Sequence, residues 1–353
     1  MELTSDTSTM KLSVIVPARN EELSLADCLR SLVAQSEDGF ALGSEWEILC
    51  VDDGSMDATR AIARSFSGVT VLVAPVPPDG WTGKNAAVWL GAEQARGELL
   101  LFTDADTVHE QGSLQRAGAE LECSGVGMLS YSPRQLVRGF WQHALMPLVF
   151  SELACLYPPS AVSDPQSAVA AANGQFVMMT REAYCMVGGH KAVAGDVLED
   201  VALARKMKRA RLGVRFRYAP DAISTWMYRS NGAMFEGWTK NLARLFPQPI
   251  WLAAMRKLDL LLMLGLPVLM WLLPRVELMM WWQRALLAAV WVHVLWRYFR
   301  RVRRSNFAWG DCVLSVAGIP LFALLLTRSW IHHTLRKQVR WKGREYSLRG
   351  TRP

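Results

Sequence analysis

Short apolar runs that end in polar turns recur along the first 130 residues of the chain. The clearest are Leu12–Val16, Ile48–Val51 and Leu99–Phe102, and carboxylate or hydroxyl side chains follow each of them closely. A fourth short run, and three segments with the spacing of amphipathic helices, lie between them: Val69–Val73, Glu22–Ala34, Asp57–Ser67 and Asn85–Ala95. This alternation predicts a doubly wound α/β sheet. Ligands bind such sheets beyond the carboxyl ends of the strands, which is where the polar turns lie.

The pattern changes after residue 130. Gln135–Tyr157 is apolar and aromatic, and it predicts either a core helix or a helix lying in a membrane interface. Two further strands are expected at Ala172–Thr180 and Val214–Tyr218, with a helix at Leu198–Arg211 between them.

Long apolar stretches dominate the chain from Trp251 onward. Three of them are distinct: Leu260–Leu273, Leu278–Trp296 and Cys312–Thr327. A straight spanning helix needs about 20 apolar residues, so these stretches predict membrane-embedded helices without fixing the number of crossings. A hairpin of the first two stretches, with the third re-entrant, would keep both arginine-rich segments that follow residue 296 on the cytoplasmic side.

The charge is divided as sharply as the hydropathy. The chain has a net charge of +7, but residues 1–250 hold 22 Lys and Arg against 28 Asp and Glu, whereas residues 251–353 hold 17 against 4. Nine of the fifteen tryptophans lie in the second part. A basic, Trp-rich, apolar tail indicates a membrane partner and no nucleic acid. We therefore expect a catalytic domain at residues 1–250 and a membrane-embedded domain at residues 251–353.

The termini and cysteines suggest where the catalytic domain lies. Met1–Met10 is polar, without the apolar core of a secretory signal, and the six cysteines show no metal-ligand spacing. Scattered in this way, the cysteines are typical of buried thiols in a reducing compartment. We expect a cytoplasmic catalytic domain held at the inner membrane.

An acidic pair stands directly after the third apolar run. Asp104 and Asp106 form a D-x-D sequence, and in an extended segment their carboxylates would point the same way, toward one hard divalent cation. Such a cation would stabilise a departing diphosphate. Taken alone the pair is also compatible with an ordinary acidic turn, and it is its position at a strand end that favours metal binding.

Other polar residues follow the neighbouring strands. Asp52 and Asp53 can accept hydrogen bonds from a nucleobase or ribose, although the sequence Asp-Asp-Gly-Ser is also a common turn. Arg19 offers a further polar contact, and Glu21 either does the same or begins a helix. Lys84 stands in a glycine-rich loop at a helix start, which suits a phosphate.

A second acidic pair, Glu199 and Asp200, opens the helix predicted after residue 198. Acidic residues in a first turn interact favourably with the helix dipole, and this explanation stays open. The functional interpretation makes Asp200 a general base that takes a proton from an acceptor hydroxyl.

In this order and spacing the motifs resemble family 2 glycosyltransferases of the GT-A fold. The matching segments, which fall within residues 11–245, are Ser13–Glu22, Val51–Ser55, Asp104–Asp106 and Glu199–Asp200. The resemblance implies a Rossmann-like, doubly wound mixed sheet followed by membrane helices. It also implies that Asp52 or Asp53 holds the nucleoside, that Asp104 and Asp106 hold a Mg²⁺ or Mn²⁺ ion with the diphosphate, and that Asp200 is the base. Together with the polar residues described above, we expect a donor site of Pro17, Arg19, Glu21, Asp52, Asp53, Lys84 and Asp104, and catalysis by Asp200 with Glu199.

A closer resemblance is to the subgroup that glycosylates membrane lipids, the carotenoid (diaponeurosporenoate) and hopene-associated glycosyltransferases. It rests on Gly80–Lys84, Glu199–Ala204, Met227–Ser230, Glu236–Asn241 and Trp341–Tyr346. The Q-x-x-R-W motif of processive polysaccharide synthases is missing at its expected place, which argues against polymer extrusion. By this resemblance the acceptor cleft would involve Gly174, Gln175, Trp238 and Lys240.

The predicted activity is transfer of a sugar, with inversion, from a nucleotide-diphosphate sugar to a lipid acceptor at the membrane. Two alternatives remain at this stage. One is a glycosyltransferase acting on a polyprenyl phosphate, and the other is a non-catalytic membrane scaffold that binds nucleotide.

Overall fold

The computed structural model describes residues 10–272, 280–336, 338–341 and 344–347. The remaining residues include most of the polar segment Met1–Met10, the junction of the first two apolar stretches, and part of the Trp341–Tyr346 motif, so the predictions made for them lie outside the described residues. Two compact units are present. Unit 1 contains residues up to 136 and 159–227, and unit 2 contains residues 137–158 and those from 228 on.

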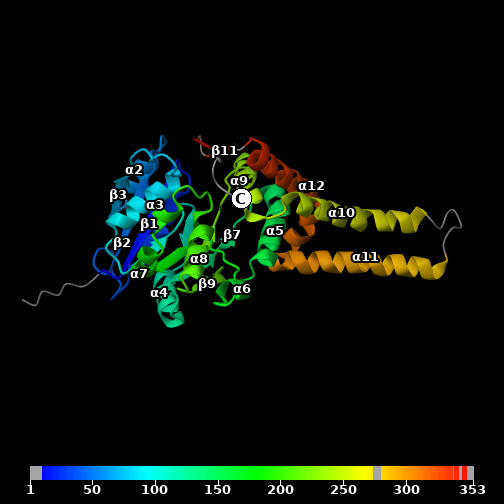
Figure 1. Cartoon of the computed structure of the whole chain (residues 1–353), viewed down its shortest axis with the longest axis horizontal. Helices are drawn as coiled ribbons and strands as arrows, with labels where there is room; N and C mark the ends of the chain where they lie inside the picture. Colours follow the sequence, from blue (N-terminus) through cyan, green and yellow to red (C-terminus); the bar gives the residue numbers. More distant parts are fainter. Residues whose placement is uncertain (1–9, 273–279, 337, 342–343, 348–353) are drawn as a thin grey trace, which may run out of the picture. The chain divides into compact units, whose positions relative to one another are not determined.

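Unit 1 is built on a seven-stranded mixed sheet with the order β3-β2-β1-β4-β8-β6-β9 (Figure 1). Only β8 runs antiparallel to its neighbours, β4 and β6. The strands are β1 Leu12–Ala18, β2 Trp46–Asp52, β3 Val69–Val73, β4 Leu99–Phe102, β6 Met128–Ser132, β8 Val177–Thr180 and β9 Val214–Tyr218. Every residue of β2 is buried, as expected for a strand covered on both faces.

Helices cover both faces of this sheet. They are α1 Leu25–Val33, α2 Thr59–Arg64, α3 Gly83–Gln94, α4 Ser113–Ser124, α6 Pro159–Ser163, α7 Arg181–Met186, the short η1 His190–Val193 and α8 Glu199–Arg209. Gly97 shows how tightly the connections pack, because a Cβ there would meet the backbone of Leu12 and Ser13 at 2.5 Å. Because β1, β2 and β4 run parallel, their carboxyl ends come together at one edge of the sheet.

A small second sheet, of order β5-β10-β7, extends the same edge of unit 1. Its strands are β5 Thr107–His109, β7 Arg134–Gln135 and β10 Ile223–Thr225. β5 begins directly after the second aspartate of the D-x-D sequence, so this sheet fixes the turn that carries both carboxylates.

Unit 2 is helical, with one short strand pair. Its elements are α5 Gly139–Leu156, α9 Asn231–Leu245, α10 Pro249–Leu272, α11 Trp281–Val302, η3 Arg303–Ser305, α12 Trp309–Ile331, η4 His332–Arg336, β11 Gln338–Trp341 and β12 Arg344–Ser347. Ten of the residues of α5 are buried, so the alternative of a core helix describes it better than an interfacial one. Within the described residues one helix, starting at Trp309, is long and apolar enough to cross a membrane, and 44% of its apolar window is buried.

The fold class expected from the sequence is confirmed: a mixed α/β sheet followed by C-terminal helices. The compact units divide differently from the expected boundary at residue 250. Because α5 and α9 pack with the C-terminal helices, residues 137–158 and 228–250 belong to unit 2. The position near 250 marks a change in charge and composition.

Candidate active site

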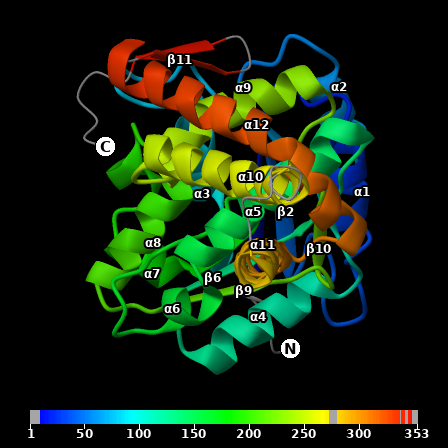
Figure 2. The ribbon, with the colours of Figure 1, turned by 90° about the vertical axis from the view of Figure 1, so that its right-hand side faces the viewer.

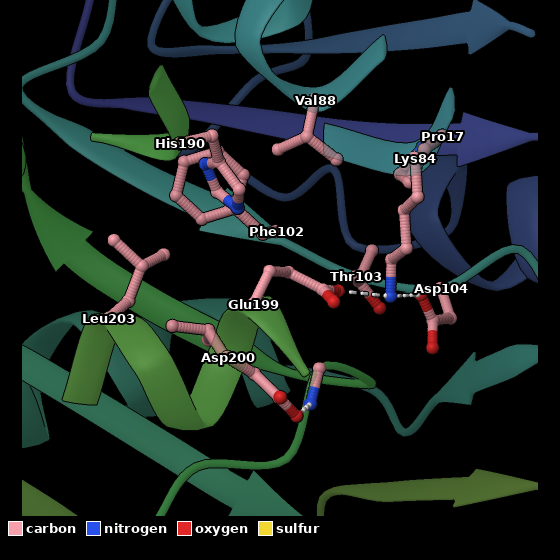
Figure 3. Close-up of a pocket in the computed structure, with 12 residues that line it drawn as sticks. Pro17, Lys84, Val88, Phe102, Thr103, Asp104, His190, Glu199, Asp200 and Leu203 are labelled. Carbon is pink, nitrogen blue, oxygen red and sulfur yellow. Dashed lines mark hydrogen bonds and ion pairs between the residues drawn. The ribbon is translucent and has the colours of Figure 1, made fainter. Parts of the chain in front are cut away.

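A hollow of about 320 Å³, including the solvent at its mouth, lies at the carboxyl edge of the main sheet (Figure 3). Strands β1 and β4, helices α3 and α8, and the loop before β8 all contribute to it. The lining residues are Pro17, Lys84, Val88, Phe102, Thr103, Asp104, Gly174, Val177, His190, Glu199, Asp200 and Leu203. Five of the residues predicted from sequence for donor binding or catalysis are therefore brought together, with Gly174 beside them.

Lys84 joins the two acidic motifs. Its ammonium nitrogen lies 2.8 Å from Oδ1 of Asp104 and 2.7 Å from Oε1 of Glu199, and Figure 3 shows it between them. Desolvation opposes the charge on Lys84, but the two carboxylates outweigh it and hold the pKa of Lys84 well above its ordinary value. The pocket therefore contains a permanent cation between the D-x-D turn and the Glu-Asp pair.

The turn that carries Lys84 is anchored from two directions. Thr82 caps α3 by accepting a hydrogen bond from the amide of Asn85. The side-chain nitrogen of Asn85 lies 2.8–3.0 Å from the carbonyl oxygens of Val193, Ala194 and Asp196. These contacts join the start of α3 to the segment that places His190 in the pocket.

Asp200 is set up to exchange a proton near neutral pH. Its Oδ2 accepts a hydrogen bond from the amide of Gly174 at 2.7 Å, and its Oδ1 accepts one from the amide of Val201 at 2.8 Å. Desolvation, followed by the neighbouring charge of Glu199, raises the pKa of Asp200 to about 7, while Lys84 and the two amide donors act in the opposite direction. A carboxylate with such a pKa is suited to general-base work.

Gly174 is required by its surroundings. A Cβ at this position would lie 3.2 Å from Nζ of Lys84 and 3.3 Å from Oδ2 of Asp200. The residue therefore gives a backbone donor to the carboxylate and leaves room beside it. Gln175, in contrast, is buried, and its side chain donates to Thr225 at 3.2 Å inside unit 1.

Asp104 and Asp106 stand in a tight turn between β4 and β5, so the extended segment assumed from the sequence is wrong. The amide of Thr107 donates to the carbonyl of Asp104 at 3.2 Å, which closes the turn. The carbonyl of Asp106 accepts a hydrogen bond from Oγ1 of Thr225 at 3.1 Å. Side-chain spacing in a strand consequently does not govern how the two carboxylates are placed.

The donor set of this turn fits a hard divalent cation. In the described part of the chain no group of three or more His, Cys, Asp or Glu residues is arranged to hold a metal. Mg²⁺ and Mn²⁺ at diphosphate sites need only one or two protein carboxylates, because phosphate oxygens and water complete the shell. The position of Lys84 against Asp104 shows that this carboxylate accommodates a positive charge.

The aspartates after β2 differ from one another. Asp52 is buried and paired with Arg60 at 2.6 Å, and its second oxygen accepts the amide of Ser55, so its carboxylate is satisfied within the fold. Asp53 lies beside Arg19, whose guanidinium donates to the carbonyl of Asp53 at 2.6 Å. Glu21 accepts a hydrogen bond from the hydroxyl of Ser24, the residue before α1. This contact agrees with the alternative that Glu21 supports the start of a helix.

Two polar pocket residues, Thr103 and His190, stand outside the set of site residues predicted from the sequence, although the resemblance also points to the segment Gly188–His190 as part of the acceptor cleft. Thr103 donates to the carbonyl of Gln175 at 2.8 Å and links β4 to the loop that carries Gly174. His190 is buried against Phe102 and lies 2.9 Å from the hydroxyl of Tyr184. Burial lowers the pKa of His190 to about 3, so its ring is neutral. An isolated His and Thr carry no spacing signal, and only the fold places them here.

Trp238 and Lys240 belong to α9 of unit 2. Trp238 is buried and packs edge-on against Tyr228 and Phe150. The carbonyl of Lys240 accepts a hydrogen bond from the ring of His333 at 2.7 Å. Both residues therefore contribute to the packing of their own unit.

Part of the site, including Lys84 and Asp104, lies in a recognised domain. Residues 13–152 match the model of glycosyl transferase family 2. Through this domain the chain belongs to glycosyl transferase family 2. The relationship predicted from the ordered acidic motifs is confirmed.

Curated relatives match a longer part of the chain than the family model does. A 4,4'-diaponeurosporenoate glycosyltransferase of Staphylococcus haemolyticus is 30% identical over 244 residues, which are 67% of this chain and 62% of the relative. The protein of the same name from Staphylococcus aureus (strain MRSA252) is 26% identical over 235 residues, which are 66% of this chain and 60% of the relative. The alignments thus span about three fifths of the length of these relatives.

A solved structure has the same fold. The mannosyltransferase from Pyrobaculum calidifontis, determined in complex with GDP-Man and Mn²⁺, aligns over 93% of this chain and 88% of its own, with a TM-score of 0.54 and 16% identity. At this identity the likeness concerns the fold alone.

Proposed function

We propose that this chain is a membrane-attached, metal-dependent, inverting glycosyltransferase. It would move a sugar from a nucleotide-diphosphate sugar to a lipid acceptor of the carotenoid or hopanoid type. The proposal rests chiefly on the two ion pairs of Lys84, one with Asp104 and one with Glu199. They bring Asp104, which would act on the donor, into one pocket with the Glu199–Asp200 pair that would supply the base. The names of the curated relatives support the acceptor class.

On the donor side, Asp53 and Arg19 would hold the nucleoside and Pro17 would border it. Asp52 and Glu21, which are engaged within the fold, would act by shaping this edge. Lys84 would stabilise the diphosphate by its charge, and its ion pair with Asp104 supports this role. A nucleotide-diphosphate sugar is present in the mannosyltransferase of the same fold, which supports this class of donor.

A divalent cation fits the same donor set. Asp104 and Asp106 would hold Mg²⁺ or Mn²⁺, which when bound neutralises charge on the departing diphosphate. The Mn²⁺ of the structurally similar mannosyltransferase supports the assignment.

On the acceptor side, Asp200 would take the proton of an acceptor hydroxyl while the electron pair that this releases on the acceptor oxygen forms a bond to the anomeric carbon. The bond from that carbon to the diphosphate breaks, and its electron pair leaves with the nucleoside diphosphate. One such displacement inverts the anomeric configuration. Gly174 orients Asp200 through its amide, and Glu199 keeps the pKa of Asp200 high. A carboxylic acid acceptor would arrive already ionised, and the base would then matter less.

Membrane attachment would come from unit 2, whose exposed surface carries many large apolar side chains and tryptophans. We propose the cytoplasmic face of the inner membrane as the location, because the arginine-rich ends of these helices favour the cytoplasmic side. Gln175, Trp238 and Lys240 would contribute to acceptor binding only indirectly, through packing.

The direct test uses the purified, detergent-solubilised chain with radiolabelled nucleotide sugars and a lipid extract. Asp106→Asn and Asp200→Asn should lose transfer to a hydroxyl acceptor, whereas Asp38→Asn, at an exposed turn, should not. Full activity in the first two variants would contradict the assigned roles. A product labile to mild acid would identify a polyprenyl phosphate acceptor, and the absence of both transfer and donor hydrolysis would favour a scaffold.

A further inference from the structure

The helix that satisfies the length and composition expected of a membrane span is α12, yet this helix forms the core of unit 2. Its buried residues recur every three or four positions along one face, and Ile319, Phe322 and Leu326 are completely enclosed. A Cβ on Gly318 would lie 2.2 Å from the carbonyl oxygen of Ala144, so α12 packs directly against the backbone of α5. Because protein covers one face of this helix, lipid could not surround it.

The helices α10 and α11 show the opposite pattern. They run antiparallel, and the indole of Trp291 donates to the carbonyl of Met263 at 2.9 Å between them. Figure 1 shows the pair side by side, extending away from the other helices of unit 2, and Figure 2 shows α11 nearly end-on. In the described residues from 267 to 272 and from 280 to 293, no side chain is buried. Exposed large apolar residues dominate this outer half: Val268, Leu269, Trp271, Leu272, Met280, Trp281, Trp282, Leu286, Val290 and Val292.

Tryptophans mark two levels along this hairpin. At its outer end Trp271, Trp281 and Trp282 are more than half exposed, and Trp296 is as well at its base, where the adjacent Arg297 pairs with Asp259 of α10. With a rise of about 1.5 Å per residue, Trp271 lies about 18 Å from the level of Asp259 along α10, and Trp281 lies about 22 Å from Trp296 along α11. These lengths are shorter than the hydrocarbon core of about 30 Å, a mismatch that local thinning of the bilayer accommodates, and tryptophan concentrates at both interfaces of a bilayer.

Buried ion pairs hold the inner end of the hairpin, its base, against α5, and this end is rich in arginine. Glu152 of α5 and Asp259 of α10 are buried and paired with three arginines. Arg256 pairs with Asp259 at 2.9 Å, Arg301 pairs with Glu152 at 2.8 Å, and Arg297 also binds Asp259. Beyond them Arg300, Arg303 and Arg304 are exposed, and this excess positive charge complements anionic phospholipid headgroups.

The outer end carries a charge of its own, the exposed Arg284. A hairpin that stopped in the middle of the bilayer would leave this guanidinium and three indoles in hydrocarbon, which is costly. A hairpin that crosses places them in the opposite headgroup layer. The charge at the outer end therefore favours a complete crossing.

We propose that the α10–α11 hairpin crosses an anionic bilayer twice and that α12 does not cross it. Both ends of α12 then lie on the cytoplasmic side together with the base of the hairpin. This inference deepens the membrane attachment in the proposed function and rests on it, but it requires no knowledge of donor or acceptor.

Thiol labelling in intact cells tests the arrangement. Met280→Cys, Ala308→Cys and Leu335→Cys place a thiol at the outer end of the hairpin, at its base and after α12, and all three positions are exposed. A membrane-impermeant maleimide should label only the first variant in intact cells and all three after the cells are opened. Peptide mapping by mass spectrometry separates these thiols from the six native cysteines.

The other patterns overturn the proposal in different ways. Labelling of Leu335→Cys in intact cells would make α12 a spanning helix. Met280→Cys that reacts only after the cells are opened would leave the outer end in the cytoplasm, available to a second copy of the chain, and Met280→Cys that never reacts would place it within hydrocarbon. Sugar transfer measured in the same membranes reports on the proposed function separately, since labelling needs no activity.

Discussion

The ammonium nitrogen of Lys84 lies 2.8 Å from Oδ1 of Asp104, so a charge of the chain itself stands beside the first aspartate of the D-x-D turn. The same nitrogen reaches Glu199 at 2.7 Å. Any cation that enters this turn must share or displace that contact. In the proposed function Lys84 would therefore compete with the metal before it helps to bind the diphosphate.

Removal of this charge should change metal binding and donor binding in opposite directions. We expect Lys84→Met to bind Mn²⁺ severalfold more tightly without nucleotide, because Asp104 loses its internal partner, while the KM for the donor rises. Electron paramagnetic resonance of free Mn²⁺ measures the first effect. The exposed Lys11→Met is the control, and unchanged Mn²⁺ affinity in the Lys84 variant would refute the competition.

The rate of transfer to a hydroxyl acceptor should depend on pH through Asp200. This carboxyl must be unprotonated to accept a proton, and its pKa is raised to about 7, so kcat/KM should decrease as the pH falls below that value. Lys84 lowers the pKa of Asp200, so the profile of Lys84→Met should move to higher pH. A flat profile across neutral pH would instead indicate an acceptor that is already ionised.

Gly174→Ala should reduce catalysis more than stability. The new methyl group would press on Lys84 and Asp200 at 3.2 and 3.3 Å, and both are partners whose placement the site needs. We expect kcat to fall by about tenfold, the effect of a barrier raised by about 1.4 kcal/mol. Gly118→Ala, where a Cβ makes only an ordinary contact with Leu99, is the matched control. Equal activity of the two variants would show that the space beside Asp200 is not needed.

Gly318→Ala should destabilise unit 2. Its Cβ would collide with the backbone of α5 at 2.2 Å, and backbone cannot rotate away as a side chain can. Overpacking of this kind costs about 1–3 kcal/mol, which would lower the Tm by about 5 °C. Tryptophan fluorescence during heating in detergent measures it. Gly310→Ala on the same helix, with open space around its Cβ, should leave the Tm unchanged or higher.

The first half of unit 1 could be predicted from sequence because its strands are short, continuous and buried on both faces. The ranges expected for β3, β4 and β9 coincide with the observed strands. β6 was missed, although all of its residues are buried, because Met128–Ser132 mixes serines with apolar residues and shows no clear run. The strand expected from residue 172 begins only at Val177, since residues 172–175 form the loop that serves Asp200.

The site was predictable as a set of residues but not as a geometry. Each acidic motif could be found from its place after a strand or at a helix start. That Lys84 would join two of them, 20 and 115 residues away, depends on strand order and on the loop between residues 190 and 196. Neither property leaves a local pattern, and the same holds for the pairing of Asp52 with Arg60, which separates two adjacent aspartates into different roles.

The contacts of Asn85 have a consequence for protein engineering. The side-chain nitrogen of Asn85 contacts three carbonyl oxygens of residues 193–196. The segment after His190 and the turn that carries Lys84 are therefore fixed to each other. Variant libraries intended to broaden the range of sugar donors should keep Asn85 constant and vary the side chains that line the pocket. A substitution of Asn85 itself would release both the segment 193–196 and the turn that carries Lys84, so its effects on donor selectivity and on the transfer rate would be inseparable.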